Sequence, residues 1–128
     1  MSVSGTEDIA RAICSDKWDA ETGILSASLF KGAETSVSRL SITPLEDTWT
    51  VFRKNVEKPP ERLLDRIGII NVQSLMDIGS NFEANPTRLS VEPDPLDGYP
   101  SHAIIPQKIS RGLANKILKS LDIREEVK

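Results

Sequence analysis

The stretch that most constrains this chain is residues 87–105, with the sequence TRLSVEPDPLDGYPSHAII. Leu89 and Val91 alternate with polar residues at its start, and SHAII at its end is a second short apolar run, so the pattern predicts two strands. Proline has no N–H to donate to a strand ladder, and Pro93 and Pro95 therefore predict a loop between these strands. We expect a hairpin on which the rest of the chain packs.

The clearest helix signal covers residues 44–57. Trp49 and Phe52 lie at the centre of an apolar stripe that has the spacing of one helical face. Thr43 followed by Pro44 is typical of a helix start, with Thr43 as the N-cap. We therefore expect this helix to bury both aromatic side chains against the sheet.

Weaker patterns predict the remaining elements. Thr6 is typical of an N-cap, and Ile9, Ala12 and Ile13 follow it at helical spacing. Asn71 and Gly79 are typical of the two ends of a second helix. The expected elements are helices over 7–13, 72–78 and 110–123, strands over 35–42 and 67–70, and a segment over 24–31 that fits either a helical turn or a strand.

Together these elements predict a single α+β domain over residues 1–128. We expect a mostly antiparallel sheet of about three to five short strands, packed by three or four helices. The length of 128 residues fits one domain, and no internal repeat divides the chain. The terminal segments 1–5 and 124–128 are expected to fray.

Composition excludes several classes of function. The net charge of −3 argues against a dedicated nucleic-acid binder, whose charge is usually positive. Cys14 is the only cysteine, so it cannot form an internal disulfide or a cysteine-based zinc site, and we expect a small buried side chain. Glu92, Asp94 and Asp97 lack the spacing of an EF-hand loop. We expect no cofactor and no metal.

The first residues, MSVSGTED, lack the basic and apolar regions of a signal peptide. No apolar run approaches the ~20 residues that a membrane-spanning helix needs. We therefore expect a cytoplasmic protein without a membrane partner.

His102 is the only histidine and the main candidate for chemistry. Its imidazole suits proton transfer near neutral pH, and Asp94 or Asp97 in the preceding loop could orient it. Arg39, on another expected strand, could stabilise an anion. A hydroxyl could come from Ser38, Ser90 or Ser101. A structural histidine, bonded to the backbone or to a carboxylate, is the favoured interpretation.

A basic series follows the clearest helix and consists of Arg53, Lys54, Lys58, Arg62 and Arg66. Three acidic residues are interleaved with it at spacings that allow local pairing, so the excess of positive charge is small. A solvated edge with salt bridges is the favoured interpretation. The alternative is a surface that binds nucleic acid weakly or binds an acidic partner.

The run SVSRL, with the later runs LSVEPDPL and SHAII, resembles a group of small bacterial proteins of uncharacterised activity. The resemblance implies a bacterial source and a small stand-alone chain. It implies no reaction, cofactor or catalytic residue.

These observations favour a non-enzymatic accessory protein that acts by binding another protein chain. Motifs such as a P-loop, G-x-S-x-G and H-E-x-x-H are absent from the sequence, whereas a proline-stiffened loop suits recognition. Two alternatives remain open. One is a small enzyme that uses His102 as acid and base, with Arg39 and either Asp94 or Asp97. The other is a weak nucleic-acid-binding module, and a homodimer is compatible with each hypothesis.

Overall fold

The computed structural model describes residues 2–19 and 21–127. Within these residues, six strands form one antiparallel sheet with the order β6-β7-β4-β1-β5-β8. The strands are β1 (Asp8–Cys14), β4 (Thr35–Arg39), β5 (Leu64–Asn71), β6 (Glu92–Pro93), β7 (His102–Ile105) and β8 (Asp122–Arg124). Two further strands, β2 (Trp18–Asp19) and β3 (Ile24–Leu25), pair separately. The fold is α+β and mostly antiparallel, as predicted, but it has more strands than the expected three to five.

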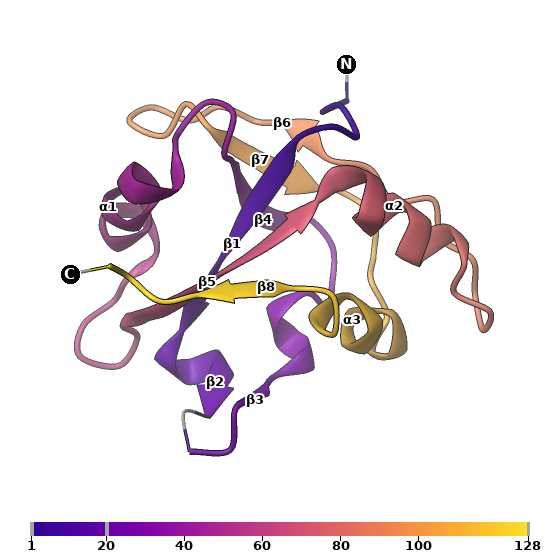
Figure 1. Ribbon diagram of the computed structural model, residues 1–128, viewed down its shortest axis with the longest axis horizontal. Coiled ribbons are helices and arrows are strands. Elements are labelled where there is room, and N and C mark those ends of the chain that lie inside the picture. Colours follow the sequence, from indigo (N-terminus) through magenta and orange to yellow (C-terminus); the bar gives the residue numbers. More distant parts are fainter. Residues whose placement is uncertain (1, 20, 128) are drawn as a thin grey trace.

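The described chain also contains three α-helices, so the upper end of the expected range, four, was too high. They are α1 (Leu45–Val56), α2 (Val72–Ser80) and α3 (Arg111–Leu118), and two 3-10 turns are η1 (Ser15–Lys17) and η2 (Ala27–Leu29). Figure 1 shows α1 on one side of the sheet and α2 with α3 on the other. The sheet is thus covered on both faces.

The sheet separates two apolar clusters. The α1-side cluster consists of Ala10, Ala12, Cys14, Trp49, Phe52, Ile67 and Tyr99. The larger α2–α3-side cluster consists of Val3, Ile9, Ile13, Leu29, Phe30, Val37, Ile70, Val72, Leu75, Leu89, Val91, Ala103, Ile105, Ile109, Leu113, Ala114 and Ile117. Cys14 is buried, as predicted, and burial raises the pKa of its thiol.

Strand β1 is hydrogen-bonded on both sides, to β4 and to β5. The prediction of a helix over 7–13 was therefore wrong. Ile9 and Ile13 belong to the α2–α3-side cluster, whereas Ala10 and Ala12 belong to the α1-side cluster. A strand that is buried on both faces is apolar on both, so it lacks the alternation of polar and apolar residues that identifies a half-buried strand.

The hairpin within residues 87–105 forms, but it lies at the edge of the sheet and not at its centre. Strand β6 contains only Glu92–Pro93, while Leu89 and Val91 are buried without belonging to a strand. The ladder closes with a bond from the Asp94 N–H to the His102 carbonyl at 2.9 Å. Strand β7 is covered on both sides, since Ala103 and Ile105 belong to the α2–α3-side cluster and His102 is buried on the opposite face.

Helix α1 begins at Leu45, and its N-cap residue is Pro44 without a side-chain cap. The predicted cap at Thr43 was wrong, because Thr43 instead donates its hydroxyl to Ser101 Oγ at 2.9 Å. The burial of Trp49 and Phe52 is confirmed, with exposed fractions of 5% and 2%. Both side chains belong to the α1-side cluster and pack against the sheet.

The other helices differ from prediction at their ends. Asn71 caps α2 as predicted, since its side chain accepts the Ser74 N–H at 3.2 Å. Gly79 lies inside α2 and does not end it in a left-handed conformation. A Cβ at Gly79 would lie 2.4 Å from the Thr87 carbonyl oxygen, so glycine is needed there for close approach. Helix α3 ends at Leu118, before the predicted Ile123.

In two segments the observed elements match the predicted ones only in part. Residues 24–31 contain both β3 and η2, so the strand and the helical turn each describe a part. Residues 122 and 123, which were expected to close the last helix, and residue 124, which was expected to fray, pair with β5 as β8. At the other end of the chain, Val3 is buried and its N–H donates to the Val91 carbonyl at 2.8 Å.

We predict that Trp49→Ala lowers the free energy of unfolding by ~3–5 kcal/mol, because it deletes a large buried side chain. The matched variant Trp18→Ala should lower it less, because Trp18 is only half-buried. Chemical denaturation of both variants measures the difference. A Trp49→Ala protein that unfolds at the wild-type midpoint would contradict the packing of α1.

Candidate functional site

A small cavity of about 200 Å³ lies on the α1 side of the sheet. Its walls come from β1, β4, β7, the loop before β7 and the last turns of α1. The polar residues that line it are Arg11, Ser36, Asn55, Tyr99 and His102. It is therefore the place where the only histidine meets other groups that can take part in chemistry.

The imidazole of His102 is bonded at both nitrogens. Nδ1 lies 2.8 Å from the backbone oxygen of Asp94 and 3.2 Å from its carboxylate Oδ2. Nε2 lies 3.1 Å from Ser36 Oγ. Because both oxygens at Nδ1 are acceptors, this nitrogen carries the proton in the neutral ring. Nε2 is then an acceptor, and Ser36 donates its hydroxyl to it.

Strand alternation and register bring these groups together. Val37 points into the α2–α3-side cluster, which leaves the neighbouring Ser36 and Ser38 on the opposite face of β4. His102 pairs with Ser38 in the ladder between β4 and β7. The hairpin then returns Asp94 to the imidazole. The local sequence, an alternating strand beside a proline-limited hairpin, thus builds the Asp94–His102–Ser36 line.

Burial differs along this line. His102 is only 7% exposed, whereas Ser36 is exposed and half of the Asp94 side chain, 50%, is exposed. The ring of Tyr99 packs edge-on against the imidazole, with centroids 5.0 Å apart and an interplanar angle of 70°. The imidazole is therefore held in a fixed orientation, and the Ser36 hydroxyl that is bonded to it is accessible to solvent.

Tyr99 adds a phenol to the cavity wall. Its ring also packs edge-on against Phe52, with centroids 6.5 Å apart. Burial raises the pKa of Tyr99 to about 12, against the opposing effect of a hydrogen bond with Ser38. The phenol is therefore protonated at neutral pH and contributes no negative charge to the cavity.

Arg11 projects from the central strand and lines the same cavity. Its Nε donates to the Leu29 carbonyl at 3.0 Å, and its Nη1 donates to the Ser36 carbonyl at 3.1 Å. Among the described residues, Arg11 forms no ion pair with a carboxylate. Burial lowers the pKa of the Arg11 guanidinium, and Cys14 and then Tyr99 oppose that shift most. A partly exposed positive charge therefore lies at the wall of the cavity.

The other predicted catalytic residues have different positions. Arg39 donates to the Glu7 carboxylate at 2.8 Å, and Ser41 also donates to that carboxylate. Asp97 lies exposed in the loop, and it is Asp94 that contacts the imidazole. Of the four predicted residues, His102 and Asp94 are therefore brought together.

The basic series is partly neutralised by carboxylates. Arg62 lies 3.4 Å from Asp16, and Arg66 lies 2.9 Å from Asp65 and 2.9 Å from Glu125. Arg53 pairs with Glu126 through both of its terminal nitrogens. Lys54 and Lys58 complete the series.

Sequence reasoning missed Ser36, Arg11 and Tyr99 as parts of a site. The alternation in TSVSR carried a signal for Ser36, since it places two hydroxyls on the face opposite Val37. A signal for Arg11 was its position in the otherwise apolar segment IARAIC. That signal is readable only once the segment is recognised as a buried strand.

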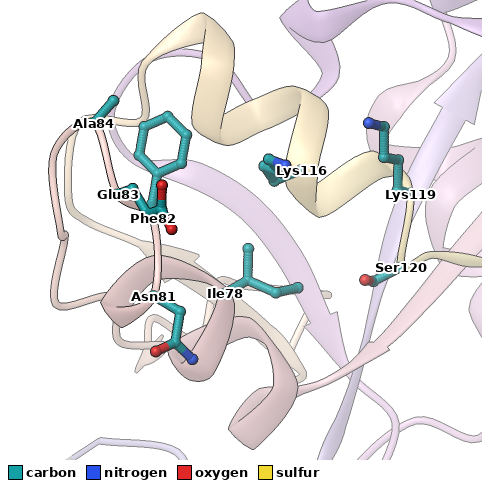
Figure 2. Close-up of a pocket in the computed structure, with 8 residues that line it drawn as sticks. All are labelled: Ile78, Asn81, Phe82, Glu83, Ala84, Lys116, Lys119 and Ser120. Carbon is teal, nitrogen blue, oxygen red and sulfur yellow. The ribbon is translucent and has the colours of Figure 1, made fainter.

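A larger cavity, about 660 Å³, lies between α2, the segment after it and α3. Figure 2 shows the Phe82 ring and Ile78 in this cavity, with Lys116 and Lys119 projecting from the α3 side. Gly112 permits this packing, because a Cβ there would lie 3.0 Å from the Phe82 ring. Its eight lining residues include neither an imidazole nor a thiol.

Residues 2–19 and 21–127 contain neither a metal-binding cluster of side chains nor a membrane-spanning helix. In these residues, no three histidine, cysteine or carboxylate side chains are grouped so that they could hold a metal ion. No helix of this part of the chain combines the length and the apolar character that crossing a membrane requires.

Comparisons with protein-family models, with curated proteins and with solved structures found no match to this chain.

We predict that Tyr99 ionises with a midpoint near pH 12 in the native protein and near pH ~10 in denaturant. Because it is the only tyrosine, absorbance at 295 nm reports its ionisation alone. The raised native pKa means that the neutral phenol stabilises the fold below pH ~10, and this contribution is lost as the pH rises through about 12. Tyr99→Phe should remove that part of the alkaline destabilisation, and a native midpoint near pH 10 would contradict its burial.

Proposed function

We propose that the protein is a small enzyme in which Ser36 is the nucleophile, His102 the general base and Asp94 the group that orients the imidazole. The observation that carries this proposal is the continuous hydrogen-bonded line from Asp94 through both nitrogens of His102 to Ser36 Oγ. A nucleophile bonded to a base, with the base bonded to a third group, is the arrangement that activates a hydroxyl.

The reaction that suits this arrangement is hydrolysis of an ester. The Ser36 proton moves to Nε2 of His102 as Oγ forms a bond to the carbonyl carbon. The imidazolium, stabilised by Asp94, then gives the proton to the leaving alkoxide as the carbon–oxygen bond breaks. Water, deprotonated by His102, attacks the acyl-serine and returns Ser36 with its proton.

The accessibility of the residues supports these roles. Ser36 is exposed, so a substrate can reach its hydroxyl, whereas His102 is buried and fixed by Tyr99. Ser36 lies in strand β4 and lacks a G-x-S-x-G turn. Such arrangements are recognised by geometry and roles and recur on unrelated folds, so the missing motif does not argue against them.

A non-enzymatic protein-binding role is the second candidate. The observation that favours it is Leu96, which lies on the proline-stiffened loop with 49% of its surface exposed. A partner that docks there would cover the mouth of the same cavity. Binding that is lost in Leu96→Asp but kept in Ser36→Ala would support this role. The nucleic-acid hypothesis stays a prediction with less support, because three arginines of the basic series are already paired.

We predict that wild-type protein hydrolyses p-nitrophenyl acetate and is labelled by a fluorophosphonate at Ser36. Ser36→Ala and His102→Gln should each lower the rate by ~100-fold or more, the scale of nucleophile activation by a positioned base. Ser28→Ala, which removes another exposed hydroxyl, is the matched control and should leave the rate unchanged. Mass spectrometry locates the label, and circular dichroism shows that each variant is folded. Wild-type hydrolysis by folded Ser36→Ala would contradict the proposal.

We predict a smaller loss for Asp94→Ala than for His102→Gln. The Asp94 backbone oxygen, at 2.8 Å, remains in this variant and still accepts the Nδ1 proton, so the tautomer is kept. The lost carboxylate weakens stabilisation of the imidazolium, and kcat should fall by about tenfold, below the ~10²–10⁴ of general base catalysis itself. Steady-state kinetics measures the two variants. Equal losses would mean that the carboxylate alone fixes the imidazole.

A further inference from the structure

The positive charge of Arg11 is not used by the proposed chemistry of Ser36 and His102. A guanidinium has five N–H donors, and two of those of Arg11 bind backbone carbonyls, at Leu29 and at Ser36. The other three bind no protein acceptor among the described residues. Arg11 is only partly buried, so these donors are free to bind an anionic ligand.

The surroundings of Arg11 do not supply that counter-ion. None of the cavity's lining residues is acidic, and Tyr99 is a neutral phenol at neutral pH. The Asp16 carboxylate attracts the Arg11 guanidinium electrostatically, but it is itself paired with Arg62 at 3.4 Å. The Asp94 carboxylate lies on the far side of the imidazole, at Nδ1. The only charged residue that lines the cavity is therefore the cationic Arg11, which keeps three N–H donors without a protein acceptor among the described residues.

The size and position of the cavity limit what can enter. Its volume of about 200 Å³ is below the ~300–1,000 Å³ of common small-molecule sites, so it suits a compact group. Arg11 is bonded to the backbone of Ser36 itself, so a group held by Arg11 lies beside the nucleophile. The guanidinium fork matches the oxygens of a carboxylate or a phosphate.

We propose that this cavity binds a compact oxyanion of the substrate through Arg11, so that the natural substrate is an ester that carries a carboxylate or phosphate close to the scissile bond. This inference rests on the proposed function, because it assigns a substrate class to the same site. Arg11 is then the residue that determines specificity, and Ser36 acts on the bond that the anion places beside it.

The kinetic test compares two p-nitrophenyl esters of similar size, the hemisuccinate, which carries a carboxylate, and the neutral butyrate. Wild-type protein should favour the hemisuccinate in kcat/KM by roughly tenfold or more, the scale of a charge-assisted hydrogen bond. Arg11→Gln should bring this ratio close to one, and Arg11→Lys should restore part of it. Lys116→Gln, which removes a cation from the other cavity, should leave the ratio unchanged. Equal use of both esters by wild-type protein, or an equal loss on both in Arg11→Gln, would overturn the inference and leave the proposed function standing.

A binding test is independent of turnover. Succinate or inorganic phosphate, each compared with sodium chloride at matched ionic strength, should raise the melting temperature of Ser36→Ala, and the better of the two identifies the oxyanion. Ser36→Ala combined with Arg11→Gln should show no such rise. If the rise depends on Arg11 but no ester is hydrolysed, the anion site stands and the proposed function fails. If neither anion raises the melting temperature, the inference is overturned.

Discussion

Strand β1 is the constraint on which the rest of this structure depends. It has strand neighbours on both sides and apolar clusters on both faces. Its side chains divide by size, with Ile9 and Ile13 towards the α2–α3 side and Ala10 and Ala12 towards α1. Small residues let α1 approach closely, so that Trp49 and Phe52 fill the space that the alanines leave. The two clusters therefore share one strand, and the loss of either cluster would destabilise the other.

The candidate site lies at a small cavity beside the α1-side cluster. Towards its second half, β1 carries Arg11, and the guanidinium bonds to carbonyls from η2 and β4. Arg11, the end of α1 and the loop before β7 line the cavity together. The hairpin β6–β7 then adds His102 and Asp94 at the edge of the same space. The polar groups of this pocket thus come from three strands, a loop and a helix.

The sequence predicted those parts of the fold that are amphipathic and local. The apolar stripe of α1, the Asn71 cap of α2 and the alternation in β4 each follow from spacing over a few residues. It did not predict β1, because burial on both faces removes the periodic signal. The same division holds at the site. Asp94 and His102 were recognisable because a turn joins them, whereas Ser36 is 66 residues from His102 and meets it only through strand pairing.

The hydrogen bond between Ser36 and His102 also depends on the register of strands β4 and β7, so activity at the site would report that register. Both residues depend on the alignment of β4 with β7, in which Ser36 faces Ile104 and Ser38 faces His102. Because successive side chains of a strand point to opposite faces, a slip of one residue would turn the imidazole into the α2–α3-side cluster and bring Ala103 to the cavity. A molecule can be compact and helical with that error, and far-ultraviolet spectra would scarcely distinguish it. Under the proposed function, the specific activity of a preparation would then measure the fraction of molecules in which β7 pairs with β4 in the native register.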